Sequence, residues 1–210
     1  MLAFSTESKL EPRINKSAPL SAVVLCGGAS KRMGRPKAFL PYGGKTLIEH
    51  CLSIISRVST DIILVCNDPD EFKHLSANVV RDLVPGKGPL VGILSGLLLA
   101  ENEDALVCPC DMPLIDEEII RSLASGRDDS ELILYGCDGA PEPLLGIYSK
   151  QCISVLEEMV FAGNYSMNEF MSRSVKKIKP FQAEGRQLPA HFSIDTPADY
   201  GRVLFSRYSI

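Results

Sequence analysis

A glycine-rich, cationic stretch near the start of the chain carries residue types that could bind a chain of phosphates. It reads LCGGASKRMGRPK and runs from Leu25 to Lys37, directly after an apolar segment. Glycines let backbone N–H groups approach a ligand closely, and cations such as Arg32 and Lys37 supply the charge that a triphosphate needs. The stretch therefore predicts a strand followed by a phosphate-binding loop.

Two common phosphate-binding loops do not fit this spacing. The dinucleotide fingerprint G-x-G-x-x-G is absent, because Gly27 and Gly28 are adjacent and the next glycine is Gly34. The segment Gly44–Thr46 ends like a Walker loop, but Phe39 stands where that loop requires its first glycine. We interpret Gly44–Thr46 as a turn followed by a helix cap.

A second candidate for chemistry lies in the apolar run from Asp104 to Pro113, which carries Asp111 towards its end. An aspartate after a strand is commonly a turn or helix-cap residue. Beside a triphosphate loop it can instead bind Mg²⁺, a hard cation that prefers one or two carboxylates together with phosphate oxygens. We expect Asp111 to be a metal ligand at the end of a strand.

Two other predicted strands also end in polar residues. Asn67 follows the apolar segment Asp61–Cys66, and Asp82 follows the short segment from Asn78. Ligands of open α/β sheets bind at the carboxyl ends of the strands, so both side chains are well placed to reach a substrate. On local sequence alone, Asn67 is equally typical of a turn before Pro69.

These motifs together resemble a known family. The arrangement G-G-x-S-x-R-M-G-x-x-K is similar to the signature of nucleotidyltransferases that activate sugars, polyols and pterins with nucleoside triphosphates. With GPLVGILSGL and CPCDMP, the chain resembles the molybdenum cofactor guanylyltransferase family from about Ala22 to about Tyr200. The resemblance implies Mg²⁺ as cofactor and transfer of GMP from GTP to the phosphate of molybdenum-molybdopterin, with release of pyrophosphate.

The resemblance also implies roles for individual residues. The implied catalytic residues are Arg32, Lys37 and Asp111, with Asp111 on the metal and Lys37 on the triphosphate. The implied nucleotide-binding residues are Leu25, Cys26, Gly27, Gly28, Lys37, Asn67, Asp82 and Asp111. Lys31 occupies a variable position of the signature, so we expect it to matter less than Lys37.

The chain departs from the family near its C-terminal end. The guanylyltransferases commonly carry Asn-x-Asn-Thr-Pro, whereas this chain has Ser193-Ile194-Asp195-Thr196-Pro197, which is closer to related cytidylyl and sugar-nucleotide enzymes. Asp195 is either a second Mg²⁺ ligand or part of the turn before a helix. The alternatives are therefore a cytidylyl- or other nucleotidyltransferase acting on a pterin, polyol phosphate or sugar phosphate, and a non-catalytic nucleotide-binding module.

Two further features each allow two interpretations. Gly92 and Gly96 lie one turn apart on a predicted apolar helix, where they would allow close packing against the sheet or against a ligand. The cations between Arg173 and Lys179 are either a solvated edge strand or a patch that attracts an anionic pterin phosphate.

Length and patterning predict the fold class. The 210 residues, 45% of them apolar, are enough to bury one core. Alternating strand and helix segments predict a three-layer α/β sandwich with a mainly parallel sheet. The resemblance implies that this is a Rossmann-like nucleotidyltransferase fold. We expect residues 19–210 to form a single domain and the polar residues 1–18 to form a flexible tail.

Charge, cysteines and hydropathy argue against several classes of protein. A net charge of −4 argues against a general nucleic-acid or membrane-surface binder. The seven cysteines lie mostly in apolar runs without metal-ligand spacing, so we expect reduced core residues. The longest apolar stretch is too short to span a bilayer and the N-terminus lacks a signal-peptide core, so we expect a cytoplasmic protein. From the resemblance we also expect a monomer that makes at most transient contacts with other cofactor-biosynthesis proteins.

Overall fold

Strands and helices alternate along the computed structural model, which describes residues 19–27, 36–137, 140–181 and 187–208. The helices are α1 (Leu47–Ile55), α2 (Pro89–Leu99), α3 (Glu117–Ser125), α4 (Ile153–Phe161), α5 (Met167–Arg173) and α6 (Pro197–Tyr208). The strands are β1 (Ser21–Cys26), β2 (Pro41–Tyr42), β3 (Lys45–Thr46), β4 (Asp61–Cys66), β5 (Asn78–Arg81), β6 (Asp104–Pro109), β7 (Leu132–Cys137), β8 (Ala140–Ser149) and β9 (Lys176–Pro180). Short 3₁₀ turns lie at Lys37–Phe39, Pro69–Phe72 and Lys150–Cys152. Within these residues, no helix combines the length and the apolar character needed to cross a membrane.

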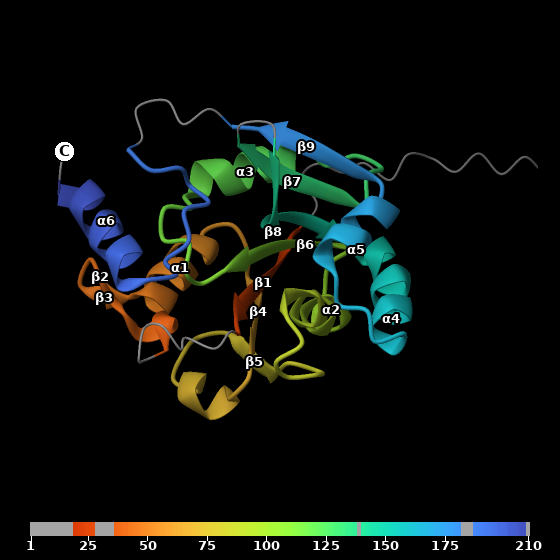
Figure 1. Ribbon diagram of the computed structural model, residues 1–210, viewed down its shortest axis with the longest axis horizontal. Coiled ribbons are helices and arrows are strands. Elements are labelled where there is room, and N and C mark those ends of the chain that lie inside the picture. Colours follow the sequence, from red (N-terminus) through yellow and green to blue (C-terminus); the bar gives the residue numbers. More distant parts are fainter. Residues whose placement is uncertain (1–18, 28–35, 138–139, 182–186, 209–210) are drawn as a thin grey trace, which may run out of the picture.

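Seven strands form one sheet in the order β5-β4-β1-β6-β8-β7-β9 (Figure 1). β1 pairs in parallel with both β4 and β6, whereas β8 runs antiparallel to β6 and β7. The expected mainly parallel sheet is therefore confirmed. β2 and β3 form a separate hairpin beside α6 (Figure 1).

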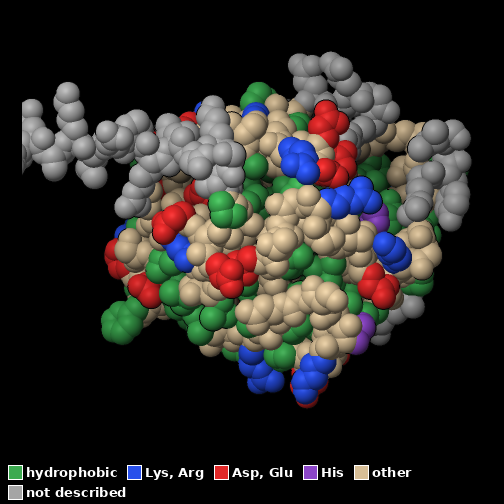
Figure 2. Space-filling model, turned by 180° about the vertical axis from the view of Figure 1, so that it is seen from behind, with side chains coloured by type: hydrophobic (Ala, Val, Ile, Leu, Met, Phe, Trp, Pro, Cys, Tyr) green, Lys and Arg blue, Asp and Glu red, His purple; other side chains and the backbone are tan. Residues whose placement is uncertain are grey.

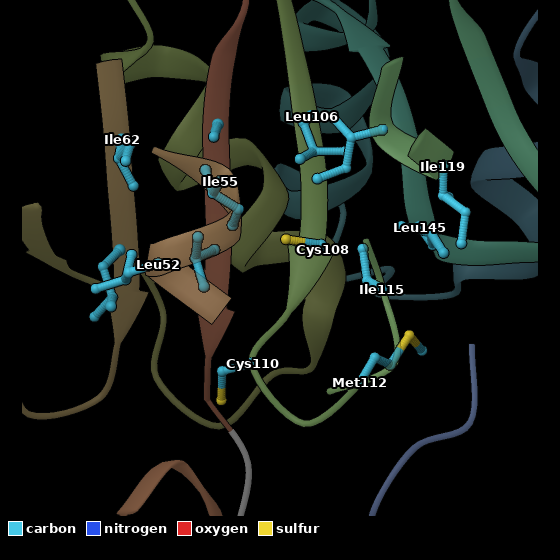
Figure 3. Close-up of a cluster of buried hydrophobic side chains, with 14 of the residues drawn as sticks. Leu52, Ile55, Ile62, Leu106, Cys108, Cys110, Met112, Ile115, Ile119 and Leu145 are labelled. Carbon is cyan, nitrogen blue, oxygen red and sulfur yellow. The ribbon is translucent and has the colours of Figure 1, made fainter. Parts of the chain in front are cut away.

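Helices cover both faces of the sheet, which explains why its central strands are apolar throughout. Ala22 and Val24 of β1 join the cluster formed with α1 and α3, while Val23 and Leu25 join the cluster formed with α2, α4 and α5. Figure 1 shows α2, α4 and α5 on one side of the sheet, and Figure 3 shows side chains of α1, β4, β6 and α3 meeting on the other. This arrangement confirms the three-layer sandwich.

Local capping signals fix the starts of α1 and α6. Thr46 precedes α1, and its hydroxyl accepts a hydrogen bond from the Glu49 N–H (3.3 Å) while the Glu49 carboxylate accepts one from the Thr46 N–H (2.7 Å). The same pattern begins α6, where the Thr196 hydroxyl accepts from the Asp199 N–H (3.2 Å). The Walker-like segment is thus a hairpin turn and a helix cap, as predicted from sequence.

The cations near the C-terminal edge strand are bound by the chain itself. β9 (Lys176–Pro180) lies at the edge of the sheet and contains three of these cations. The pairs are Arg173 with Glu158 (2.7 Å), Lys176 with the Met171 carbonyl (2.7 Å), Lys177 with Asp128 (2.7 Å), and Lys179 with the Ser122 carbonyl. These contacts favour the edge-strand interpretation over an anion-binding patch. On the face seen in Figure 2, basic and acidic side chains are likewise interspersed.

Helix α2 packs very closely against β1. A Cβ atom placed on Gly96 would lie 2.2 Å from Val23 Cγ1, far inside van der Waals contact. A Cβ on Gly92 would lie 3.1 Å from Leu25 Cδ2. Packing of the helix against the sheet therefore accounts for both glycines.

We expect Gly96→Ala to lower the free energy of unfolding by about 1–3 kcal/mol, because the new methyl group overlaps Val23 and forces the helix away from the sheet. Gly201→Ala in α6 is a matched control, since nothing lies within 4 Å of its Cβ position. There, alanine should be neutral or stabilising by up to about 1 kcal/mol. Denaturant titration measures both, and a Gly96→Ala variant as stable as the parent would contradict the packing argument.

Candidate active site

The carboxyl ends of the parallel strands β1, β4, β5 and β6 meet at one edge of the sheet. In the register of the sheet, Cys26 lies beside Cys66, Cys66 beside Arg81, and Leu25 beside Pro109. The polar or glycine residues that follow these strand ends are Gly27, Asn67, Asp82 and Asp111. Four of the residues implied from sequence are thus brought to one edge by the pairing of the strands.

The strand order of the sheet reverses at β1. From β1 the chain builds outward through β4 and β5, and α2 then carries it back across to β6 on the other side of β1. In doubly wound sheets, ligands bind outside the carboxyl ends of the strands at such a reversal. The end of β1 leads directly into the glycine-rich stretch.

Lys37 lies between two carboxylates at this point. Its Nζ atom is 3.1 Å from Asp111 Oδ2 and 2.6 Å from Asp195 Oδ1. Lys37 belongs to a 3₁₀ turn, Asp111 follows β6, and Asp195 precedes α6. The fold therefore brings together residues that are 74 and 158 positions apart.

Burial controls the charges of this group. The side chains of Lys37 and Asp111 are only 18% and 20% exposed, whereas that of Asp195 is 60% exposed. Burial raises the pKa of Asp111 above its ordinary value, and the opposing effect of the Lys37 ammonium does not cancel this. Burial by itself would lower the pKa of Lys37, but hydrogen bonds and charge from Asp195 and Asp111 outweigh it and raise the pKa. Lys37 thus stays positively charged, and Asp111 is a poorly solvated carboxylate that gains from any added cation.

The backbone around Asp111 is held on both sides. The Cys110 N–H donates to the Leu25 carbonyl (3.1 Å), which extends the pairing of β1 and β6 by one residue. The Asp111 carbonyl accepts from the Ile194 N–H (3.0 Å), and the Ser193 hydroxyl donates to the Asp111 carboxylate. Sequence reasoning did not single out Ser193 for this contact, because no local pattern links it to Asp111.

Asp82 occupies the β5 end of the same edge. Its Oδ1 atom lies 3.2 Å from the Ser95 hydroxyl of α2, which also accepts from the Leu83 N–H (3.0 Å). Burial raises the pKa of Asp82, and hydrogen bonds from Ser95 and the N–H groups of Val84 and Leu83 only partly oppose it. Ser95 escaped sequence reasoning because it lies among the apolar residues of α2.

The other residues implied from sequence differ in exposure. Leu25 is buried, Cys26 is half-buried, and Gly27 and Asn67 are exposed. Gly28 and Arg32 lie outside the described residues. Lys37 and Asp111 are in direct contact, whereas Asn67 and Asp82 lie on the β4–β5 side of the edge.

The cysteines of the chain are free and lie in or beside the core. Cys66, Cys108, Cys110 and Cys152 are buried, and Cys108 and Cys110 appear among the core side chains in Figure 3. Burial raises the pKa of the Cys66 thiol to about 11. Burial likewise raises the pKa of Cys26, which contacts Cys110. These thiols are therefore poor nucleophiles, as expected of core residues.

The carboxylates around Lys37 fit a hard divalent cation. Among the described residues, no group of three or more His, Cys, Asp or Glu side chains is arranged to hold a metal by itself. Mg²⁺ does not need such a cage, because one or two carboxylates and the oxygens of a phosphate chain complete its coordination. The Lys37 ammonium between Asp111 and Asp195 shows that this point already accommodates positive charge.

Comparison with known proteins identifies the family of the chain. The family model described as the MobA-like NTP transferase domain matches residues 22–178. A probable molybdenum cofactor guanylyltransferase of Carboxydothermus hydrogenoformans is 36% identical over 192 residues, which cover 88% of this chain and 95% of that protein. A protein with the same description in Clostridium perfringens is 32% identical over 186 residues, covering 86% and 93%.

A solved structure shares the fold. Molybdopterin-guanine dinucleotide biosynthesis protein A from Archaeoglobus fulgidus superposes with a TM-score of 0.74 at 26% identity, covering 90% of this chain and 100% of that chain. The sequence resemblance, the doubly wound sheet and the contact of Lys37 with Asp111 thus lead to one assignment. The chain belongs to the MobA-like NTP transferase domain family and is a nucleotidyltransferase.

Proposed function

We propose that the chain transfers GMP from GTP to the phosphate of molybdenum-molybdopterin, giving molybdopterin guanine dinucleotide and pyrophosphate in a reaction that requires Mg²⁺. The observation that carries this proposal is the contact between Lys37 Nζ and Asp111 Oδ2, at 3.1 Å, where the strand order reverses. A lysine and a carboxylate at that place suit a metal-bound triphosphate. The descriptions of the relatives supply the base and the acceptor.

The chemistry needs little more than positioning and charge. An oxygen of the acceptor phosphate forms a bond to the α-phosphorus of GTP, while the bond from that phosphorus to the β-phosphate oxygen breaks and pyrophosphate leaves with the electron pair. The attacking oxygen is already an anion, so no general base is required. Mg²⁺ at Asp111, when bound, would supply charge neutralisation on the phosphates. Catalysis then rests on holding the reacting groups in line and stabilising the developing charge.

We assign the phosphate contacts to residues at the end of β1. Lys37 would bind the triphosphate, and the backbone N–H of Gly27 would approach it. A Cβ atom on Gly27 would meet nothing within 4 Å, so the space beside this residue is open to a ligand. Arg32 and Gly28 have the same proposed roles on the basis of the family signature. Leu25 and Cys26 would line the nucleotide as β1 ends.

The β4–β5 side of the edge would receive the nucleoside. Asn67 is exposed there and would reach the ribose or base. The half-buried Asp82 would accept hydrogen bonds from guanine N1–H and the exocyclic amine. Such a carboxylate disfavours bases that lack these donors, because the acceptor positions that Ser95, Leu83 and Val84 leave open would then be half-buried and unsatisfied.

Two other functions remain as alternatives. A cytidylyltransferase, or a nucleotidyltransferase acting on a polyol or sugar phosphate, would share Lys37 and Asp111 and is favoured by the sequence Ser193-Ile194-Asp195. A nucleotide-binding module without activity is opposed by the intact contact of Lys37 with Asp111. Pyrophosphate release with Mg²⁺, each nucleoside triphosphate and candidate acceptors separates the three.

We expect Asp111→Asn to keep the fold but to lose Mg²⁺-dependent transfer by about a hundredfold or more, because the amide keeps the size of the side chain and removes its charge. Asp128→Asn is the matched control, since Asp128 pairs with Lys177 away from the site. Rates of pyrophosphate release measure both. A folded Asp111→Asn variant that transfers at the parent rate would show the metal assignment to be wrong.

Lys37→Ala should reduce kcat/KM by roughly a hundredfold, since losing a phosphate contact in the transition state costs about 3 kcal/mol. Lys45→Ala should leave kcat/KM near the parent value, because Lys45 is exposed on the β2–β3 hairpin. Lys31→Ala should also cost less than Lys37→Ala. An equal loss of kcat/KM in Lys37→Ala, Lys45→Ala and Lys31→Ala would contradict the special role proposed for Lys37.

The parent protein should use GTP in preference to CTP and ATP. Asp82→Ala should lower the rate with GTP relative to the rates with CTP and ATP. The test is turnover of a molybdopterin acceptor by the parent and the variant with the three triphosphates in competition. A preference for CTP in the parent would move the chain to the cytidylyl group and leave the roles of Lys37 and Asp111 unchanged.

A further inference from the structure

Asp195 makes the closer of the two contacts with Lys37, at 2.6 Å against 3.1 Å for Asp111. The contacts that Asp195 makes in the turn before α6 use its backbone, because its N–H donates to Asp199 Oδ2 (3.2 Å). Its carboxylate is therefore not needed for the turn and reaches Lys37 instead.

The backbone on both sides of Asp195 is fixed. Ile194 is fully buried, and its N–H donates to the Asp111 carbonyl (3.0 Å). The Thr196 N–H donates to Asp199 Oδ2 (2.8 Å) at the start of α6. The Asp195 carboxylate thus projects from a segment that is tied to Asp111 on one side and to a helix on the other.

A lysine at a phosphate site needs such an anchor. Its ammonium sits on a flexible four-carbon chain and has three donors, so ordering it costs conformational entropy. Asp111 cannot be the permanent anchor under the proposed function, because there its oxygens would turn to the cation. Asp195 can keep one donor of Lys37 occupied while the donor that now contacts Asp111 turns to the phosphates.

We propose that Asp195 is a positioning residue, which holds the Lys37 ammonium in its working place rather than binding the metal or shaping the turn. The proposal rests on the proposed function for the identity of the triphosphate. The contact itself is independent of it. Asp195 acts through Lys37 and touches neither the reacting atoms nor the cation.

The first test measures the contact without nucleotide or metal. The parent, Asp195→Asn and Asp195→Ala proteins are treated with acetic anhydride, and the rate at which each lysine is acylated is followed by mass spectrometry of its peptide. Lys37 should react several-fold faster in Asp195→Ala, because the 2.6 Å hydrogen bond that restrains its Nζ atom is lost and the side chain becomes more accessible to the reagent. Lys45 serves as the internal control and should not change. An unchanged rate at Lys37 would overturn the proposal.

The second test asks whether Asp195 acts through Lys37 during turnover. Asp195→Ala should lower kcat by about tenfold or more, and Asp195→Asn by less, because the amide oxygen still accepts a hydrogen bond from the ammonium. The Mg²⁺ concentration for half-maximal rate should stay at the parent value. In a Lys37→Met background, Asp195→Ala should cause no further loss.

Three results would overturn the proposal in this second test. A raised Mg²⁺ requirement would make Asp195 a metal ligand, and the same fold loss in the Lys37→Met background would make its effect independent of Lys37. A parent-like kcat in both single variants would show that the contact of Asp195 with Lys37 has no part in turnover. If the parent protein transfers no GMP, the proposed function fails, and the acylation rates still decide whether Asp195 anchors Lys37.

Discussion

The contact between the Lys37 ammonium and the Asp111 carboxylate is the constraint on which the rest of the site depends. Both side chains are mostly buried, at 18% and 20% exposed, so neither charge is well solvated alone. Removing one partner of a fully buried pair costs about 3–5 kcal/mol, because the other charge is left uncompensated. Partial exposure reduces that cost here. The remaining cost means that Lys37 and Asp111 can separate only if each charge finds another group of opposite charge.

Lys37 and Asp111 are in contact because the sheet brings the ends of β1 and β6 to the same edge. The strands are covered on both faces and must be apolar, so polar groups occur where the strands end. The register of β1 and β6 sets Leu25 beside Pro109, and the bond from the Cys110 N–H to the Leu25 carbonyl continues the pairing to the residue before Asp111. The position of the carboxylate is thus fixed by backbone pairing, and the side chain of Lys37 has to reach it.

Much of the fold could be predicted because its signals are local. The apolar run Ser21–Cys26, the capping box before α1 and the acidic start of α3 each depend on residues a few positions apart. The position of Lys37 depends on contacts with Asp111 and Asp195 over 74 and 158 residues, and no local pattern encodes such a separation. Sequence reasoning therefore singled out Lys37 as a cation of the glycine-rich loop and Asp111 as a carboxylate after a strand, left Asp195 between two roles, and did not consider a contact with Lys37.

The charge of Asp195 has consequences that an asparagine in its place would not have. With asparagine, Lys37 and Asp111 would form a neutral pair; with Asp195, one positive and two negative charges leave a net charge of −1 among the three side chains. That excess repels a free triphosphate and attracts a cation, although the 60% exposure of Asp195 screens the effect. The same carboxylate keeps the Lys37 ammonium in place. The Asp195 carboxylate therefore has two effects. It hinders the entry of a triphosphate without a metal, and it orders Lys37, which would bind the triphosphate.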